Sequence, residues 1–200
     1  PRSGGDLLAS HAYLTGTLDG TGARGVALNR ERARLGGSAR LDAGFSAAGQ
    51  VRLQQARIEG DLDCSGAAFD SIGDASWGDN SAALLLDRAR IGGALILRNL
   101  PGPLQGASLI DARVGSLLDD ASTWGQHHVL DGFAYTRFAP HAPTDAPMRL
   151  DWLTRQNAAH LGAEFRPEPW RRLIKVLRRS GRDESAREVA IGRERHLRQA

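Results

Sequence analysis

The segment Ala56-Arg57-Ile58-Glu59-Gly60 decides the fold, because its pattern of alanine, arginine, aliphatic residue and glycine occurs four times in the chain. The other copies are Ala33-Arg34-Leu35-Gly36, Ala89-Arg90-Ile91-Gly92 and Ala112-Arg113-Val114-Gly115. Successive alanines are 23, 33 and 23 residues apart. Self-similarity at a period of about 20–50 residues is typical of solenoids, in which each repeat packs on the next.

The residues around these segments favour short strands over helices. Apolar and polar residues alternate over short runs, as in Asp61-Leu62-Asp63-Cys64, and the runs end at glycine, asparagine or serine. An amphipathic helix would instead need apolar residues at i, i+3, i+4 and i+7. Residues 46–56, which are rich in alanine and glutamine, could also be helical, but the regular repeat outweighs that alternative.

Stacking of such strands predicts a mainly β chain with a C-terminal α part, in which residues 1–124 form a right-handed parallel β-helix. One coil cannot bury its inward side chains alone, whereas coils stacked at about 4.8 Å place like residues over like. The small alanines fit the interior, and the arginines beside them must lie in water. We therefore expect an outward ladder of Arg34, Arg57, Arg90 and Arg113.

The longest interval between repeats contains a polar, glycine-bearing stretch at residues 70–81. Its length accounts for the 10 residues by which the middle interval exceeds the other two. We interpret it as a loop inserted between coils.

Residues 125–200 are predicted to form a connector and a helical cap. Pro147 can occupy the first position of a helix that runs to about Ala159, with Asp145 as N-cap. A second helix opens at Pro169 and places four apolar residues on one face: Trp170, Leu173, Ile174 and Leu177. Gly181 is expected to end that helix and Asp183 to cap the next. Such a hairpin would cover the open end of the solenoid.

The positive charge of the chain is concentrated in this hairpin. Residues 166–200 contain 11 Lys/Arg and 5 Asp/Glu, although the whole chain has a net charge of only +3. The candidate contact residues there are Arg171, Arg172, Lys175, Arg178 and Arg179. They could contact an anionic membrane surface, could bind nucleic acid, or could form an ordinary solvated helix face. No aromatic residues interleave with the arginines, which disfavours nucleic acid.

Four local patterns suggest chemistry, but each has a simpler reading. Residues 20–25 match G-x-G-x-x-G, yet they do not lie between a strand and a helix as a dinucleotide site requires. His127-His128 lacks the spacing of metal ligands and is expected to lie in a loop. Asp119-Asp120 resembles a solvated turn, and the single cysteine, Cys64, a small buried apolar residue. We therefore predict no catalytic, cofactor or metal site.

The chain resembles the degenerate pentapeptide-like repeat proteins of actinobacteria that are often labelled membrane-associated oxidoreductases. The more specific matches lie in the C-terminal part, among them Arg149-Leu150-Asp151-Trp152-Leu153, Pro167-Glu168-Pro169-Trp170 and Val176-Leu177-Arg178. The family usually has tyrosine at the position of Trp170. The resemblance implies a parallel β-helix with a helical cap, in parent proteins that continue into membrane-spanning segments.

These observations favour a non-enzymatic scaffold or protein-interaction module, the soluble portion of a membrane-associated bacterial protein at the cytoplasmic face of the membrane. Its partners would be an unidentified protein, bound by the arginine ladder, and an anionic membrane surface. The alternative is an enzyme whose site lies at the 70–81 loop and the His127-His128 connector.

Overall fold

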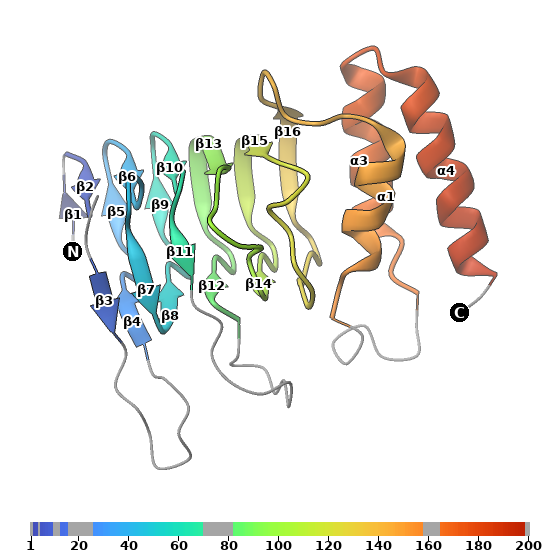
Figure 1. The fold of residues 1–200 in the computed structure, drawn as a ribbon. Helices are drawn as coiled ribbons and strands as arrows, with labels where there is room; N and C mark the ends of the chain where they lie inside the picture. The colour runs from blue at the N-terminus through green and yellow to red at the C-terminus, as the bar shows by residue number, and fades with distance from the viewer. Residues whose placement is uncertain are drawn as a thin grey trace.

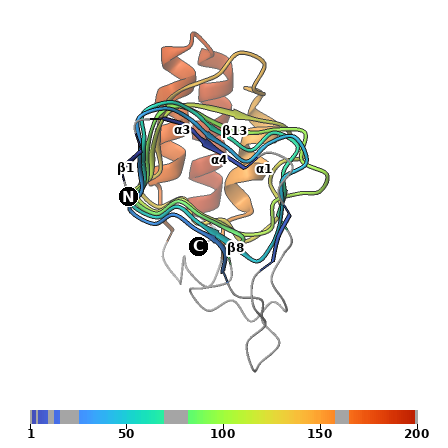
Figure 2. The same ribbon diagram turned by 90° about the vertical axis from the view of Figure 1, so that its left-hand side faces the viewer.

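The computed structural model of the chain describes residues 2–3, 5–9, 13–15, 26–69, 82–157 and 165–198. Short parallel strands stack along one axis, and helices follow at the C-terminal end (Figure 1). Viewed along that axis, the coils lie over one another in outline (Figure 2). The predicted parallel β-helix with a helical cap is confirmed, and the repeat at Ala56 and its equivalents is its structural unit.

The largest sheet contains the arginine segments and runs the length of the solenoid. Each strand pairs in parallel with the strand one coil further on. Its first half contains β1 (Arg2–Ser3), β5 (Arg34–Leu35) and β9 (Arg57–Ile58), and its second half β2 (Leu7–Leu8), β6 (Ala39–Arg40) and β10 (Leu62–Asp63). The later strands span both halves: β13 (Arg90–Leu97), β15 (Arg113–Asp119) and β16 (Ala134–Phe138).

Two smaller sheets complete each coil. One contains β3 (Tyr13–Thr15), β7 (Ser46–Ala48) and β11 (Ala68–Phe69). The other contains β4 (Val26–Asn29), β8 (Gln50–Arg52), β12 (Leu84–Leu85) and β14 (Ala107–Ser108). Residues 46–56 thus contribute β7 and β8 rather than a helix.

Like residues stack over like in the interior, as the repeat predicts. Leu62, Leu95 and Leu117 are register partners in successive coils, and all three are fully buried. The four repeat alanines are also buried, and each accepts a hydrogen bond at its carbonyl from a backbone N–H of the next coil. The core is therefore a stack of mostly aliphatic side chains, joined by buried aromatic residues such as Phe45 and Trp124.

The turn that precedes each repeat alanine is built mostly without glycine. The residue just before the alanine has a left-handed backbone in all four repeats, with φ of 55–59° at Arg32, Gln55, Arg88 and Asp111. In the following coil the equivalent position is occupied by Gly132, with φ of 67°. Cross-coil hydrogen bonds to these turns offset the cost of the left-handed conformation.

Stacking continues beyond Trp124, the last residue of the visible repeat. Strand β16 pairs with β15, so that Ala134 lies opposite Arg113 and Tyr135 opposite Val114. The segment expected to be an irregular connector therefore contributes a further strand to the solenoid. It was missed because it lacks the alanine–arginine pattern.

The helical cap follows that strand. Helices α1 (Ala146–Thr154), α3 (Glu168–Arg179) and α4 (Asp183–Leu197) lie beyond β16, with α3 against the last coil and α4 outermost (Figure 1). Asp145 caps α1 as predicted by accepting a hydrogen bond from the N–H of Met148. The helix ends at Thr154 rather than Ala159, because Gln156 pairs with His128 of the solenoid.

The turn between α3 and α4 follows the sequence closely. Gly181 has φ of 72°, and the N–H of Arg182 donates to the carbonyl of Leu177, which closes a Schellman motif. Contrary to the prediction, the N-cap of α4 is Arg182 rather than Asp183, and the Arg182 side chain makes no capping hydrogen bond. Asp183 and Glu184 instead occupy the first turn, where their negative charges interact favourably with the positive end of the helix dipole.

Close backbone contact between coils gives one testable consequence. A Cβ at residue 115 would overlap the carbonyl oxygens of Gly92 and Gly93 in the preceding coil. We expect Gly115→Ala to lower the free energy of unfolding by about 1–3 kcal/mol, measured by urea denaturation. Gly102, which has open space around it, is the control: Gly102→Ala should change stability by less than about 0.5 kcal/mol. Equal effects would contradict the stacking described here.

Candidate interaction surface

The outer face of the large sheet has a continuous row of arginines. Arg34, Arg57, Arg90 and Arg113 are register partners in four successive coils, and all four side chains are exposed. Neighbouring parallel strands lie about 4.8 Å apart, so the row extends over roughly 14 Å. Within the described part of the chain, none of these four guanidinium groups forms an ion pair or a side-chain hydrogen bond. We call this row the arginine ladder.

The ladder is longer at backbone level than the repeat indicates. Arg2 of β1 is the register partner of Arg34. The repeat does not indicate Arg2, because no alanine precedes it and the pattern is lost there. In the last coil the position is held by Ala134, so the row of arginines ends at Arg113.

A shallow groove of about 410 Å³ runs beside the ladder. Its lining includes Arg57, Arg90, Arg113 and the next outward column, which holds Glu59, Gly92, Gly115 and Thr136. Cβ atoms at Gly92 and Gly115 would overlap backbone atoms of the preceding coil, so these positions carry no side chain. The absence of side chains in this column opens the groove, and Glu59 is the one carboxylate among its lining residues.

The cationic residues predicted on the cap divide into two groups. Arg171, Lys175, Arg178 and Arg179 are exposed on α3. Arg172 instead lies at the joint between cap and solenoid, close to Tyr135 and Trp152. One of its guanidinium nitrogens lies 3.9 Å from the Glu168 carboxylate. Four of the five predicted residues therefore share an exposed face.

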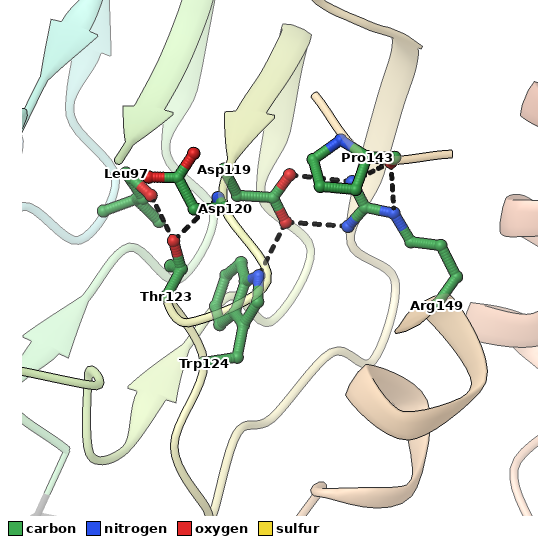
Figure 3. Close-up of polar contacts among 7 residues, drawn as sticks. All are labelled: Leu97, Asp119, Asp120, Thr123, Trp124, Pro143 and Arg149. Carbon is green, nitrogen blue, oxygen red and sulfur yellow. Dashed lines mark hydrogen bonds and ion pairs between the residues drawn. The ribbon is translucent and has the colours of Figure 1, made fainter. Parts of the chain in front are cut away.

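A buried ion pair joins the solenoid to the cap (Figure 3). Asp119 lies at the end of β15 and Arg149 on α1, and both side chains are completely buried. The guanidinium donates to both carboxylate oxygens at 2.7 Å and also to the carbonyl of Pro143. It stacks on the ring of Phe138 at 4.0 Å, and the indole N–H of Trp124 donates to Asp119. Each side-chain nitrogen and oxygen atom of the pair thus has at least one hydrogen-bond partner inside the protein.

The burial of Asp119 contradicts the expectation of a solvated Asp119-Asp120 turn. Asp120 is only partly buried and accepts a hydrogen bond from the N–H of Asn99. Alternation along a strand gives the reason: Asp119 follows Leu117 by two residues, so both point inward. The pair has no free position for a ligand, and we assign it a structural role.

His128 is also buried, although the His127-His128 pair was expected to lie in a loop. Its Nε2 donates to the carbonyl of Gly125 at 2.9 Å, and the ring packs edge-on against Trp124. Burial lowers the pKa of His128 from 6.5 to about 4, with a further contribution from the nearby Arg155. The imidazole is therefore neutral in the folded protein at pH 7.

The low pKa of His128 predicts loss of stability in mild acid. The unfolded chain binds a proton near pH 6.5 and the folded chain only near pH 4, so stability falls as pH falls through this window. Between pH 7 and pH 5 we expect a loss of about 2 kcal/mol from this group, measured by urea denaturation. In His128→Gln that loss should shrink markedly, and an unchanged pH dependence in the variant would contradict the assignment.

Among the residues that the structure describes, no three of the His, Cys, Asp and Glu side chains gather where they could hold a metal ion. Cys64 is fully buried, and burial raises the pKa of its thiol, so it is unreactive as predicted for a small core residue. The 70–81 loop and the glycine motif at residues 20–25 lie outside the described residues. No helix in the described part of the chain is long and apolar enough to cross a membrane.

Comparison with models of known protein families, with curated proteins and with solved structures returned no match. Any assignment of function to this chain therefore depends on the surfaces and sites of the molecule itself.

Proposed function

We propose that this chain is a non-enzymatic scaffold, a protein-interaction module that recognises an acidic partner through its arginine ladder. The alignment of Arg34, Arg57, Arg90 and Arg113 in one register carries the proposal. Like charges that lie directly opposite one another on neighbouring strands are destabilising. An anionic partner removes that repulsion, and guanidinium groups form bidentate hydrogen bonds with carboxylates.

The enzyme alternative has less support. It placed a site at the 70–81 loop, which lies outside the described residues, and at His127-His128. The imidazole of His128 is enclosed by Trp124 and engaged with Gly125, and so is not presented to a substrate. The ladder is by contrast exposed and lies beside a groove.

Affinity capture with a matched charge change tests the scaffold proposal. The chain is immobilised, incubated with lysate of the source organism and compared with Arg57→Glu/Arg90→Glu. A control, Arg187→Glu/Arg195→Glu, makes the same change of net charge on α4, away from the groove. We expect acidic proteins to be retained by the wild type and the control and lost from the ladder variant. Retention that is the same for all three chains would overturn the proposal.

We further propose that the module lies at the cytoplasmic face of a bacterial membrane, with the exposed cations of α3 towards anionic lipid. Arg171, Lys175, Arg178 and Arg179 are exposed on one helix, and each cation near such a surface contributes about 1 kcal/mol. Co-sedimentation with phosphatidylglycerol vesicles tests this. Binding should be salt-sensitive and should be lost in Lys175→Glu/Arg178→Glu; binding that is absent from the wild type would refute it.

A further inference from the structure

We infer that the arginine ladder fits an α-helix with a stripe of acidic side chains. This inference rests on the proposed function and names the shape of the partner. Three features of the surface support it: the length of the ladder, the groove beside it and the position of Glu59.

The length of the ladder selects the helix. Four arginines in successive coils extend over roughly 14 Å. Acidic residues at i, i+3, i+7 and i+10 of a helix lie on one side and extend over about 15 Å, at 1.5 Å per residue. In an extended peptide, four same-face residues at i, i+2, i+4 and i+6 extend over about 20 Å. The helical stripe and the ladder agree in length to within about 1 Å, a difference that the long arginine side chains can accommodate. The four same-face residues of the extended peptide exceed the length of the ladder by about 6 Å.

The groove explains why a convex partner fits better than a flat one. The column beside the ladder lacks side chains at Gly92 and Gly115, so the surface there is hollowed next to Arg90 and Arg113. Side chains that flank an acidic stripe can enter that space. A lipid surface presents no comparable ridge.

Glu59 argues against a continuous anionic surface. It is exposed and lies two residues after Arg57, so it points to the same side of the strand and lines the groove. Its carboxylate would repel phospholipid headgroups or a nucleic-acid backbone wherever they covered this face. A helix can place a lysine or a neutral residue opposite Glu59 while its acidic stripe contacts the arginines.

Synthetic peptides test the inference directly. One alanine-based helical peptide has glutamates at i, i+3, i+7 and i+10, and a second has the same composition with the glutamates distributed around the helix. A third has the striped sequence with a central proline, which breaks the helix. Fluorescence anisotropy measures the binding of each peptide to the full chain, to Arg57→Glu/Arg90→Glu and to the α4 control Arg187→Glu/Arg195→Glu.

We expect the striped peptide to bind the wild type and the α4 control at least about tenfold more tightly than the other two peptides, and to lose that advantage in the ladder variant. Glu59→Gln should strengthen its binding about threefold by removing the one opposing charge. Equal binding of all three peptides would overturn the helical stripe and leave the ladder as an acid-binding face. Weaker binding of the striped peptide than of a single-stranded oligonucleotide or phosphatidylglycerol vesicles at the ladder would overturn it in favour of those ligands.

Discussion

Replacing Arg149 by methionine is expected to lower the free energy of unfolding by about 3–5 kcal/mol, because the change leaves the Asp119 carboxylate buried without its cation. Methionine fills similar space and can still pack on Phe138. The loss of stability therefore reflects the missing positive charge more than a change in side-chain volume. Urea denaturation followed by circular dichroism gives the value.

The control for Arg149 is a partly exposed arginine with an ion pair. Arg193 contacts Glu194 on the outer helix, and Arg193→Met should change stability by less than about 0.5 kcal/mol. The double variant Asp119→Leu/Arg149→Met should cost less than the sum of its two single changes, because neither charge is then left unpaired. Additive costs would show that the two side chains act independently, contrary to the structure.

Leu95→Ala is expected to cost about 2–5 kcal/mol, because it opens a cavity in the middle of the stacked core. Leu95 lies between Leu62 and Leu117 of the neighbouring coils, and all three are fully buried. The same denaturation experiment measures the loss.

Ile96 provides the matched control for Leu95, since it is the next residue on the same strand and points to the other side. It is only partly buried, and Ile96→Ala should cost about 1 kcal/mol. A larger loss of stability in Ile96→Ala than in Leu95→Ala would show that the opposite face of β13 packs in the core, contrary to the structure.

The repeat predicted the solenoid because each coil must bury the same kind of side chains against its neighbours. A buried alanine, an outward arginine and an inward aliphatic residue recur at one register, and this local pattern can be read from a single chain. The last coil could not be found in this way. There Phe133 takes the place of the alanine and Ala134 that of the arginine, because the end of the stack packs against the cap rather than another repeat.

The ion pair between solenoid and cap could not be predicted from the sequence, for a different reason. Arg149 looks like any cation on a helix of mixed polarity, and its partner Asp119 lies 30 residues away. Only the folded chain brings the two together. Period-two alternation from Leu117 would have placed Asp119 inward, but its identity as a carboxylate beside Asp120 favoured a solvated turn.

The arginine ladder could be predicted as a set of residues but not as a binding surface. Its groove exists because backbone contact between coils excludes side chains at Gly92 and Gly115, which appears only once the register is known. The same register sets the distance over which a partner must place its charges.

A crystal structure of the chain measures that register most directly. We predict that the Cα atoms of Arg34, Arg57, Arg90 and Arg113 lie in one row with successive separations of about 4.8 Å and with their side chains in solvent. Arginines displaced from that row, or turned into the core, would contradict both the stacked fold and the recognition surface proposed for it.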